Sequence, residues 1–214
     1  MTLRIGCLLI LLSPLCLGKT LLILGDQLSS GAGLPTNTAW PALLKQRIKH
    51  TYPGIKSVNV SVSGMSTQGG LQLLPAYLIH TDPTWIILFL GYQNMLNATP
   101  LAHTQKQLTQ LIRQAKVYGH VLLVGTQLPQ AHPQAIHNLG INTLYQTLAK
   151  TEGVAYLPKL LATLTEDDFQ SDQSTPNQKA QAKLLAKLWP KIKTLLAKTP
   201  SSRILSPNNF GEET

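Results

Sequence analysis

The chain has 214 residues, of which 43% are hydrophobic and only 13% are charged. This length and apolar content favour one compact domain with a sizeable core and exclude a chain that is disordered throughout. The formal net charge of +9 leaves contact with an anionic partner open.

Residues 1–18 have the layout of a cleavable secretory signal. Arg4 precedes an apolar stretch that is too short to span a bilayer comfortably, and small residues stand before Lys19. We therefore expect export, with cleavage before Lys19. The alternatives are a buried first strand or helix turn over residues 8–12, and a lipid anchor on Cys16, which Leu15 before it disfavours.

The expected domain organisation is a signal peptide over 1–18, one domain over 19–199 and a loose tail over 200–214, which is rich in Ser, Pro, Asn and Glu. Both cysteines, Cys7 and Cys16, lie in the signal, so the processed chain would hold no disulfide and no cysteine metal site. The histidines show no metal-ligand spacing. We predict no metal and no cofactor.

Short apolar runs alternate with longer helical patterns along the chain. The expected strands are Leu21 to Leu24, Val58 to Val62, Trp85 to Leu90, Val121 to Gly125 and Val154 to Tyr156. The expected helices cover about 38–50, 68–80, 100–118, 136–151 and 176–198. This alternation predicts an α/β fold with a parallel sheet between two helical layers, and a ligand site beyond the carboxyl ends of the strands.

The last expected helix is basic and amphipathic. No acidic residue occurs from Gln173 to Gly211, whereas lysines recur between apolar positions such as Leu184 and Leu188. One interpretation is a helix that faces an anionic membrane surface; the other is the solvated face of a terminal helix. We expect no nucleic-acid partner, because no stacking aromatics interleave with these charges.

Four sequence blocks follow the expected strands. They are Gly25-Asp26-Gln27-Leu28, with Trp40-Pro41-Ala42-Leu43-Leu44 after it; Val62-Ser63-Gly64-Met65; Gly91-Tyr92-Gln93-Asn94; and Asp172-Gln173-Ser174-Thr175-Pro176-Asn177. In this order they resemble the motifs of the SGNH, or GDSL, hydrolases, and most closely the bacterial periplasmic acyl thioesterase, lysophospholipase and arylesterase group. The resemblance implies a flavodoxin-like α/β/α sandwich with five parallel strands, hydrolysis of esters or thioesters, and a periplasmic location.

The residues that carry the family's chemistry are altered in this chain. Gln27 stands where the resemblance places the nucleophilic serine, and an amide cannot form an acyl-enzyme intermediate. Thr175 stands at the place of the catalytic histidine and cannot hold a proton near neutral pH. Asp172, which would orient that histidine, is kept. We therefore expect no intact catalytic set.

The resemblance also indicates the oxyanion and binding positions. Gly64 is kept, Gln93 takes the place of the family's asparagine, and Asn94 replaces the neighbouring acid. Together with Gln27 these residues would form a polar cleft. The apolar residues near it either line an acyl groove or belong to the core: Leu71, Leu74, Tyr77 and Met95.

Two functions compete, besides a purely structural role. In the first, the chain is a pseudoenzyme that binds an acyl ester, thioester, lipid, carbohydrate or partner. In the second, it is an active esterase, acyl thioesterase or lysophospholipase that uses water held by Asp172 or a relocated nucleophile. The candidates for the latter are Ser29, Ser30 and Ser174, with His132 or His137 nearby, although each also suits an ordinary structural role. The sequence gives no indication of the oligomeric state.

Overall fold

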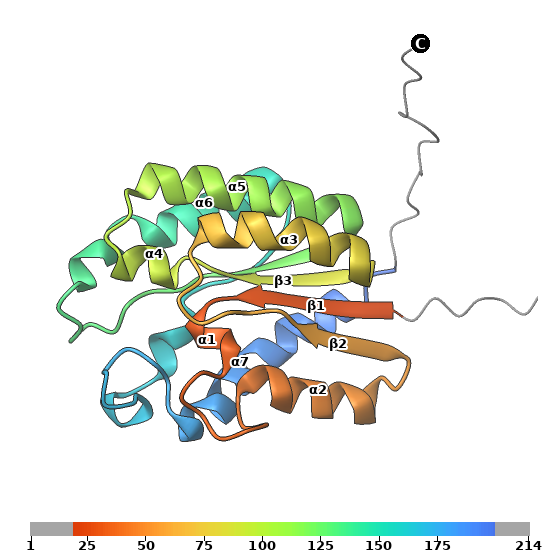
Figure 1. The fold of residues 1–214 in the computed structure, drawn as a ribbon, viewed down its shortest axis with the longest axis horizontal. Coiled ribbons are helices and arrows are strands. Elements are labelled where there is room, and N and C mark those ends of the chain that lie inside the picture. The colour runs from red at the N-terminus through yellow and green to blue at the C-terminus, as the bar shows by residue number, and fades with distance from the viewer. Residues whose placement is uncertain (1–18, 200–214) are drawn as a thin grey trace, which may run out of the picture.

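The computed structural model describes residues 19–199 (Figure 1), so the expected signal and tail lie outside the described residues. Five parallel strands form one sheet in the order β2-β1-β3-β4-β5. The strands are β1 (Lys19–Gly25), β2 (Ile55–Asn59), β3 (Trp85–Phe89), β4 (His120–Val124) and β5 (Ala155–Leu157). The predicted α/β class with a five-stranded parallel sheet is confirmed.

Two helical layers cover the sheet. In Figure 1, α2 (Trp40–Thr51) and α7 (Gln178–Leu196) lie on one face. The other face is covered by α3 (Thr67–Thr81), α5 (Leu101–Tyr118) and α6 (Ile141–Glu152). Short helical turns sit beyond the strand ends: α1 (Gln27–Ser30), α4 (Tyr92–Leu96), η1 (Ala135–Asn138), η2 (Leu160–Thr163) and η3 (Glu166–Asp168).

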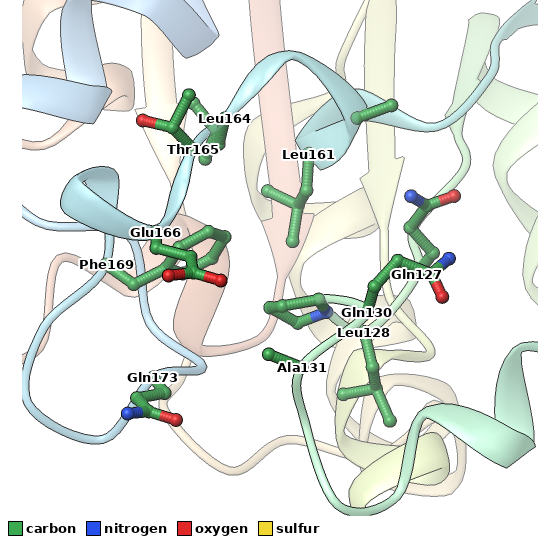
Figure 2. Close-up of a pocket in the computed structure, with 12 residues that line it drawn as sticks. Gln127, Leu128, Gln130, Ala131, Leu161, Leu164, Thr165, Glu166, Phe169 and Gln173 are labelled. Atoms are coloured by element: carbon green, nitrogen blue, oxygen red, sulfur yellow. The ribbon is translucent and has the colours of Figure 1, made fainter.

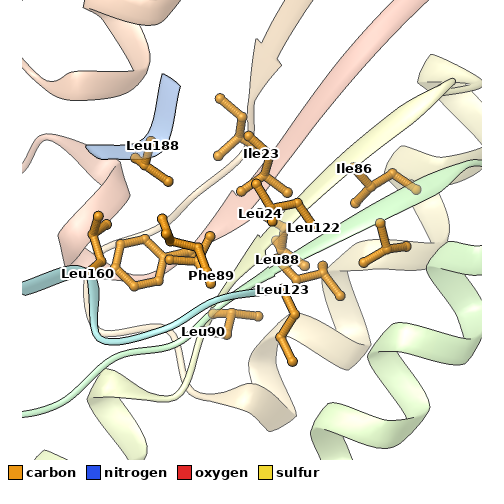
Figure 3. Packing of buried hydrophobic residues seen from close by; sticks show 14 of the residues in the cluster. Ile23, Leu24, Ile86, Leu88, Phe89, Leu90, Leu122, Leu123, Leu160 and Leu188 are labelled. Atoms are coloured by element: carbon orange, nitrogen blue, oxygen red, sulfur yellow. The ribbon is translucent and has the colours of Figure 1, made fainter. Parts of the chain in front are cut away.

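The central strands are apolar along their whole length because both of their faces are covered. Every residue of β3 is buried, and β1 is buried from Thr20 onward. Figure 3 shows side chains of β1, β3 and β4, among them Ile23, Leu88 and Leu122, packed in one continuous cluster. This pattern is typical of parallel sheets in α/β proteins.

Strand β2 differs from its prediction. It spans Ile55–Asn59 rather than Val58 to Val62. It is an edge strand whose residues are half-buried or exposed, so its first half lacks the apolar signal of the central strands. The chain beyond it still follows β1, since Val60 N donates to the Ile23 carbonyl and Val62 N to the Gly25 carbonyl.

The helix expected over 136–151 is also wrong at its start. Residues Ala135–Asn138 form a separate 3-10 turn, and α6 begins only at Ile141. Gly140 between them has a φ of 74°, in the left-handed region that a continuous right-handed helix does not use.

Helix α7 positions the start of α2. The side-chain oxygen of Gln181 accepts a hydrogen bond from Trp40 N at 3.0 Å, and the indole of Trp40 donates to the Leu28 carbonyl at 2.9 Å. These bonds fix α1, directly after β1, against the two helices of one face.

Candidate functional site

Asp26 joins the ends of the two central strands. It follows β1, is fully buried, and accepts hydrogen bonds from Leu28 N at 3.2 Å and from Tyr92 N at 3.1 Å. One carboxylate thus holds the first turns of both α1 and α4. Burial raises the pKa of Asp26 to about 7, although the backbone N–H groups of Leu28, Tyr92 and Gln93 act in the opposite direction.

Tyr92 extends this connection to the last sequence block. Its buried hydroxyl donates to the Ser174 carbonyl at 2.6 Å, across 82 positions of sequence. The second block is tied in through Val62 N, which donates to the Gly25 carbonyl at 3.1 Å. All four blocks therefore meet at the carboxyl edge of the sheet, with Gly64 exposed in the turn before α3 at a φ of 76°.

Gln27 is the first residue of α1 and is half-buried. Its side-chain oxygen is buried and has no hydrogen-bond partner within residues 19–199. The same holds for the Thr126 hydroxyl, directly after β4 and Gly125. An unpaired buried polar atom is costly, so each of these two atoms is a site where a buried water could supply a hydrogen bond.

Asp172 and Thr175 are in contact. The Asp172 carboxylate accepts hydrogen bonds from Thr175 N at 2.8 Å and Ser174 N at 2.9 Å. Desolvation raises the pKa of Asp172, but the hydrogen bonds from the hydroxyl and backbone N–H groups of Thr175 and Ser174 outweigh it and hold this pKa below its usual range. The carboxylate that would orient a histidine instead fixes the loop on which Thr175 lies.

The two amides of the third block have different surroundings. Gln93 is half-buried, and its NH₂ group donates to the Asn97 side chain at 2.8 Å along α4. Asn94 is buried; it accepts from Thr67 N at 2.9 Å and donates to the Thr67 and Thr104 hydroxyls. Asn94 therefore fastens α4 to α3 and α5.

The serines considered as relocated nucleophiles differ in their surroundings, and the buried Ser29 hydroxyl has no hydrogen-bond partner within residues 19–199. Ser29 is fully buried, and the Ser30 hydroxyl accepts a hydrogen bond from Ala32 N at 3.2 Å. Ser174 is buried beside Asp172. His132 Nδ1 accepts from Gln134 N in a local turn. Across the described part of the chain, no hydrogen bond joins any of these serine hydroxyls to a histidine.

A pocket of about 400 Å³ opens between the loop after β4 and the loop after β5 (Figure 2). Apolar side chains of Leu128, Leu161 and Phe169 line it together with the amides of Gln127 and Gln173. The remaining lining residues are Pro129, Gln130, Ala131, Ala162, Leu164, Thr165 and Glu166. Glu166 is the one charged residue of this lining.

Neither this pocket nor the linking role of Tyr92 was predicted from the sequence. The available signal was the position of Thr126 and Gln127, which follow a strand end as the four blocks do. The residues considered for an acyl groove belong to the core or pack against it: Leu74 and Met95 are buried, and Leu71 and Tyr77 are half-buried. Within residues 19–199, no group of three or more His, Cys, Asp or Glu side chains is placed to hold a metal ion.

Fold and site together define a doubly wound α/β protein with its polar site at the carboxyl edge of the sheet. Residues 23–184 match the GDSL-like Lipase/Acylhydrolase family, and the chain belongs to this family. It is 35% identical to Esterase TesA of Pseudomonas aeruginosa over 89% of this chain and 96% of that protein.

Two further comparisons with known proteins support this family assignment. The chain is 34% identical to Thioesterase 1/protease 1/lysophospholipase L1 of Escherichia coli K12, over 76% of this chain and 77% of that protein. A crystal structure of TesA superimposes with a TM-score of 0.77 at 33% identity, covering 83% of this chain and 99% of the other. The predicted resemblance to the SGNH and GDSL hydrolases is confirmed.

Proposed function

We propose that this chain is a GDSL-family protein that binds an acyl ligand without hydrolysing it. The observation that supports this most is the pair Gln27 and Thr175 at the places of the nucleophile and the base. In a catalytic triad these groups act as a unit, so their joint loss leaves only the acceleration provided by binding and by oxyanion donors.

The pocket between the β4 and β5 loops is the proposed ligand site. Its apolar lining suits an acyl chain, and the neighbouring amides suit an ester, thioester or hydroxyl group. Glu166 is its one charge and is negative, so an uncharged ligand fits better than a free carboxylate. Export to the periplasm, inferred from residues 1–18, is part of the proposal.

The decisive experiment measures hydrolysis of short- and long-chain p-nitrophenyl esters and of an acyl thioester. It compares the chain from Lys19 onward with its Gln27→Ser/Thr175→His variant. We expect the natural chain to remain at the buffer background. The double variant should exceed it by about 100-fold or more, because it restores the hydroxyl and the imidazole that act as a unit in the family's triad.

The matched control is Gln27→Ala/Thr175→His, which supplies the imidazole without a nucleophile and should stay at background. Turnover by the natural chain that persists through purification and disappears in Ser29→Ala, Ser30→Ala or Ser174→Ala would contradict the proposal. It would establish an active hydrolase with a relocated nucleophile.

A further inference from the structure

The positive charge of the chain is concentrated on one face. Helices α2 and α7 lie side by side on the same side of the sheet (Figure 1), and neither contains an acidic residue. The exposed cations of these helices, with Lys198 just beyond α7, are Lys45, Arg47, Lys49, Lys179, Lys183, Lys191, Lys193 and Lys198. We call this surface the basic face.

Most of these charges are not neutralised. Lys183 pairs with Asp168 at 2.6 Å, but the other exposed cations of the basic face form no ion pair with any residue in 19–199. On the opposite helical layer, by contrast, Arg113 and Lys116 both pair with Glu152. The two helical layers therefore differ in how many of their cations are unpaired, as well as in composition.

A groove of about 330 Å³ lies between α2 and the first half of α7, within the basic face. Leu43, Ala182 and Leu185 supply apolar surface, while Arg47 and His50 supply basic groups. The Arg47 guanidinium also lies over the half-buried Trp189 ring, 5.2 Å from its centroid, and Tyr52 packs against the same ring. Apolar surface and aromatic rings beside cations suit the boundary between lipid headgroups and acyl chains.

We infer that the basic face docks on an anionic phospholipid bilayer, with phosphates on the lysines and headgroup glycerol or upper acyl carbons over the groove. A single-stranded nucleic acid fits less well, because Trp189 is already covered by Arg47 and Tyr52 and is not available to stack on a base. Within residues 19–199 no helix is long and apolar enough to cross a bilayer. The contact is peripheral and therefore depends on salt.

The docking inference does not depend on whether the site hydrolyses anything. Docking would also bring lipid, a source of ligand, near the site. Helix α7 begins two residues after Pro176, and Gln181 near its start accepts a hydrogen bond from Trp40 N at the start of α2. One end of the basic face thus adjoins the loop of Asp172 and Thr175, so docking would hold the site close to lipid.

The test is sedimentation of the chain from Lys19 to Thr214 with vesicles. Residues 1–18 are omitted because this apolar segment would partition into lipid by itself. Vesicles of equal parts phosphatidylglycerol and phosphatidylcholine are compared with pure phosphatidylcholine. We expect binding to the anionic vesicles alone, and its loss at about 0.5 M NaCl.

The informative variant is Lys49→Glu/Lys193→Glu, which alters one exposed lysine on each helix of the basic face. We expect it to bind anionic vesicles about 30-fold more weakly or worse, because two lysines that attract anionic headgroups are removed. The control is Lys106→Glu/Lys150→Glu on α5 and α6, which makes the same change in net charge and should bind normally. Circular dichroism confirms folding, and Lys49→Gln/Lys193→Gln replaces the first variant if that one does not fold.

Three outcomes overturn the inference: absence of binding to anionic vesicles, equal binding to phosphatidylcholine, or equal losses in the test and control variants. If the chain does not bind vesicles but binds single-stranded DNA through Lys49 and Lys193, the basic face is assigned to a nucleic acid instead.

Discussion

The burial of Asp26 has two opposing effects, on its hydrogen bonds and on its ionisation. Its carboxylate must stay buried to reach Leu28 N and Tyr92 N on two separate helical turns, yet burial disfavours its ionised form. The sequence alone indicates a turn residue after a strand. It does not indicate that this turn is covered on all sides by chain segments from elsewhere.

A pH dependence of stability follows from this burial. The unfolded chain releases the Asp26 proton near a pKa of about 3.9, whereas the folded chain keeps it up to about pH 7. Between these values the folded state binds more protons, so the stabilising effect is present at low pH and is lost as the pH rises through about 7.

We therefore expect the free energy of unfolding of the natural chain to fall relative to Asp26→Asn by about 2–3 kcal/mol from about pH 5 to about pH 8. Urea unfolding of both proteins at the two pH values measures this difference, and effects of other titrating groups cancel. If the difference in free energy of unfolding between the two proteins is the same at both pH values, Asp26 is ionised in the folded chain throughout this range.

At the scale of elements, the proposed ligand pocket depends on two loops that follow adjacent strands. Ala131 lies exposed in the loop after β4 and lines the pocket. An Ala131→Trp substitution should fill the pocket and weaken binding of an uncharged probe, 1-monodecanoylglycerol, at least about tenfold, equivalent to about 1.4 kcal/mol. Isothermal titration calorimetry measures the effect.

The control for this pocket is Ala102→Trp, which adds the same indole to an exposed position on α5 away from the pocket. It should leave the affinity unchanged. Equal weakening by both substitutions, or decanoate binding as tightly as the uncharged probe, would refute the assignment of the pocket or of its preference for uncharged ligands.

The sequence predicted the central elements well because their signals are local. Strands β1, β3 and β4 are short apolar runs, and the amphipathic helix α5 begins and ends within about one residue of its prediction. Strand β2 was displaced because an edge strand is half-exposed and is defined by its pairing with β1. The break before α6 depends on one backbone conformation, at Gly140.

The candidate site was only partly predictable. The identities of Gln27, Asp172 and Thr175 are visible in the sequence, and the structure brings the last two into contact. The contact of Tyr92 with Ser174 and the pocket around Phe169 arise between segments far apart in sequence. No local pattern encodes such contacts, since they depend on how the strands are ordered in the sheet.

At the scale of the whole molecule, one continuous core includes residues from every layer, from Leu44 of α2 through β1 and β3 to Leu111 of α5. The three tryptophans lie in or against this core in different elements: Trp40 in α2, Trp85 in β3 and Trp189 in α7. We expect a single cooperative unfolding transition, with the same midpoint by tryptophan fluorescence and far-ultraviolet circular dichroism. Separate midpoints would show that one helical layer unfolds before the other.

The hydrogen bonds of Asp172 have an evolutionary consequence. This carboxylate now holds its own loop through the Ser174 and Thr175 amides, so selection for folding alone is enough to retain it. In the same way Asp26 is retained by the two helical turns that it caps. If hydrolysis is lost as we propose, selection for folding alone would still preserve Asp26 and Asp172, while Gln27, Gln93 and Thr175 stand where the resemblance places the nucleophile, the oxyanion asparagine and the base.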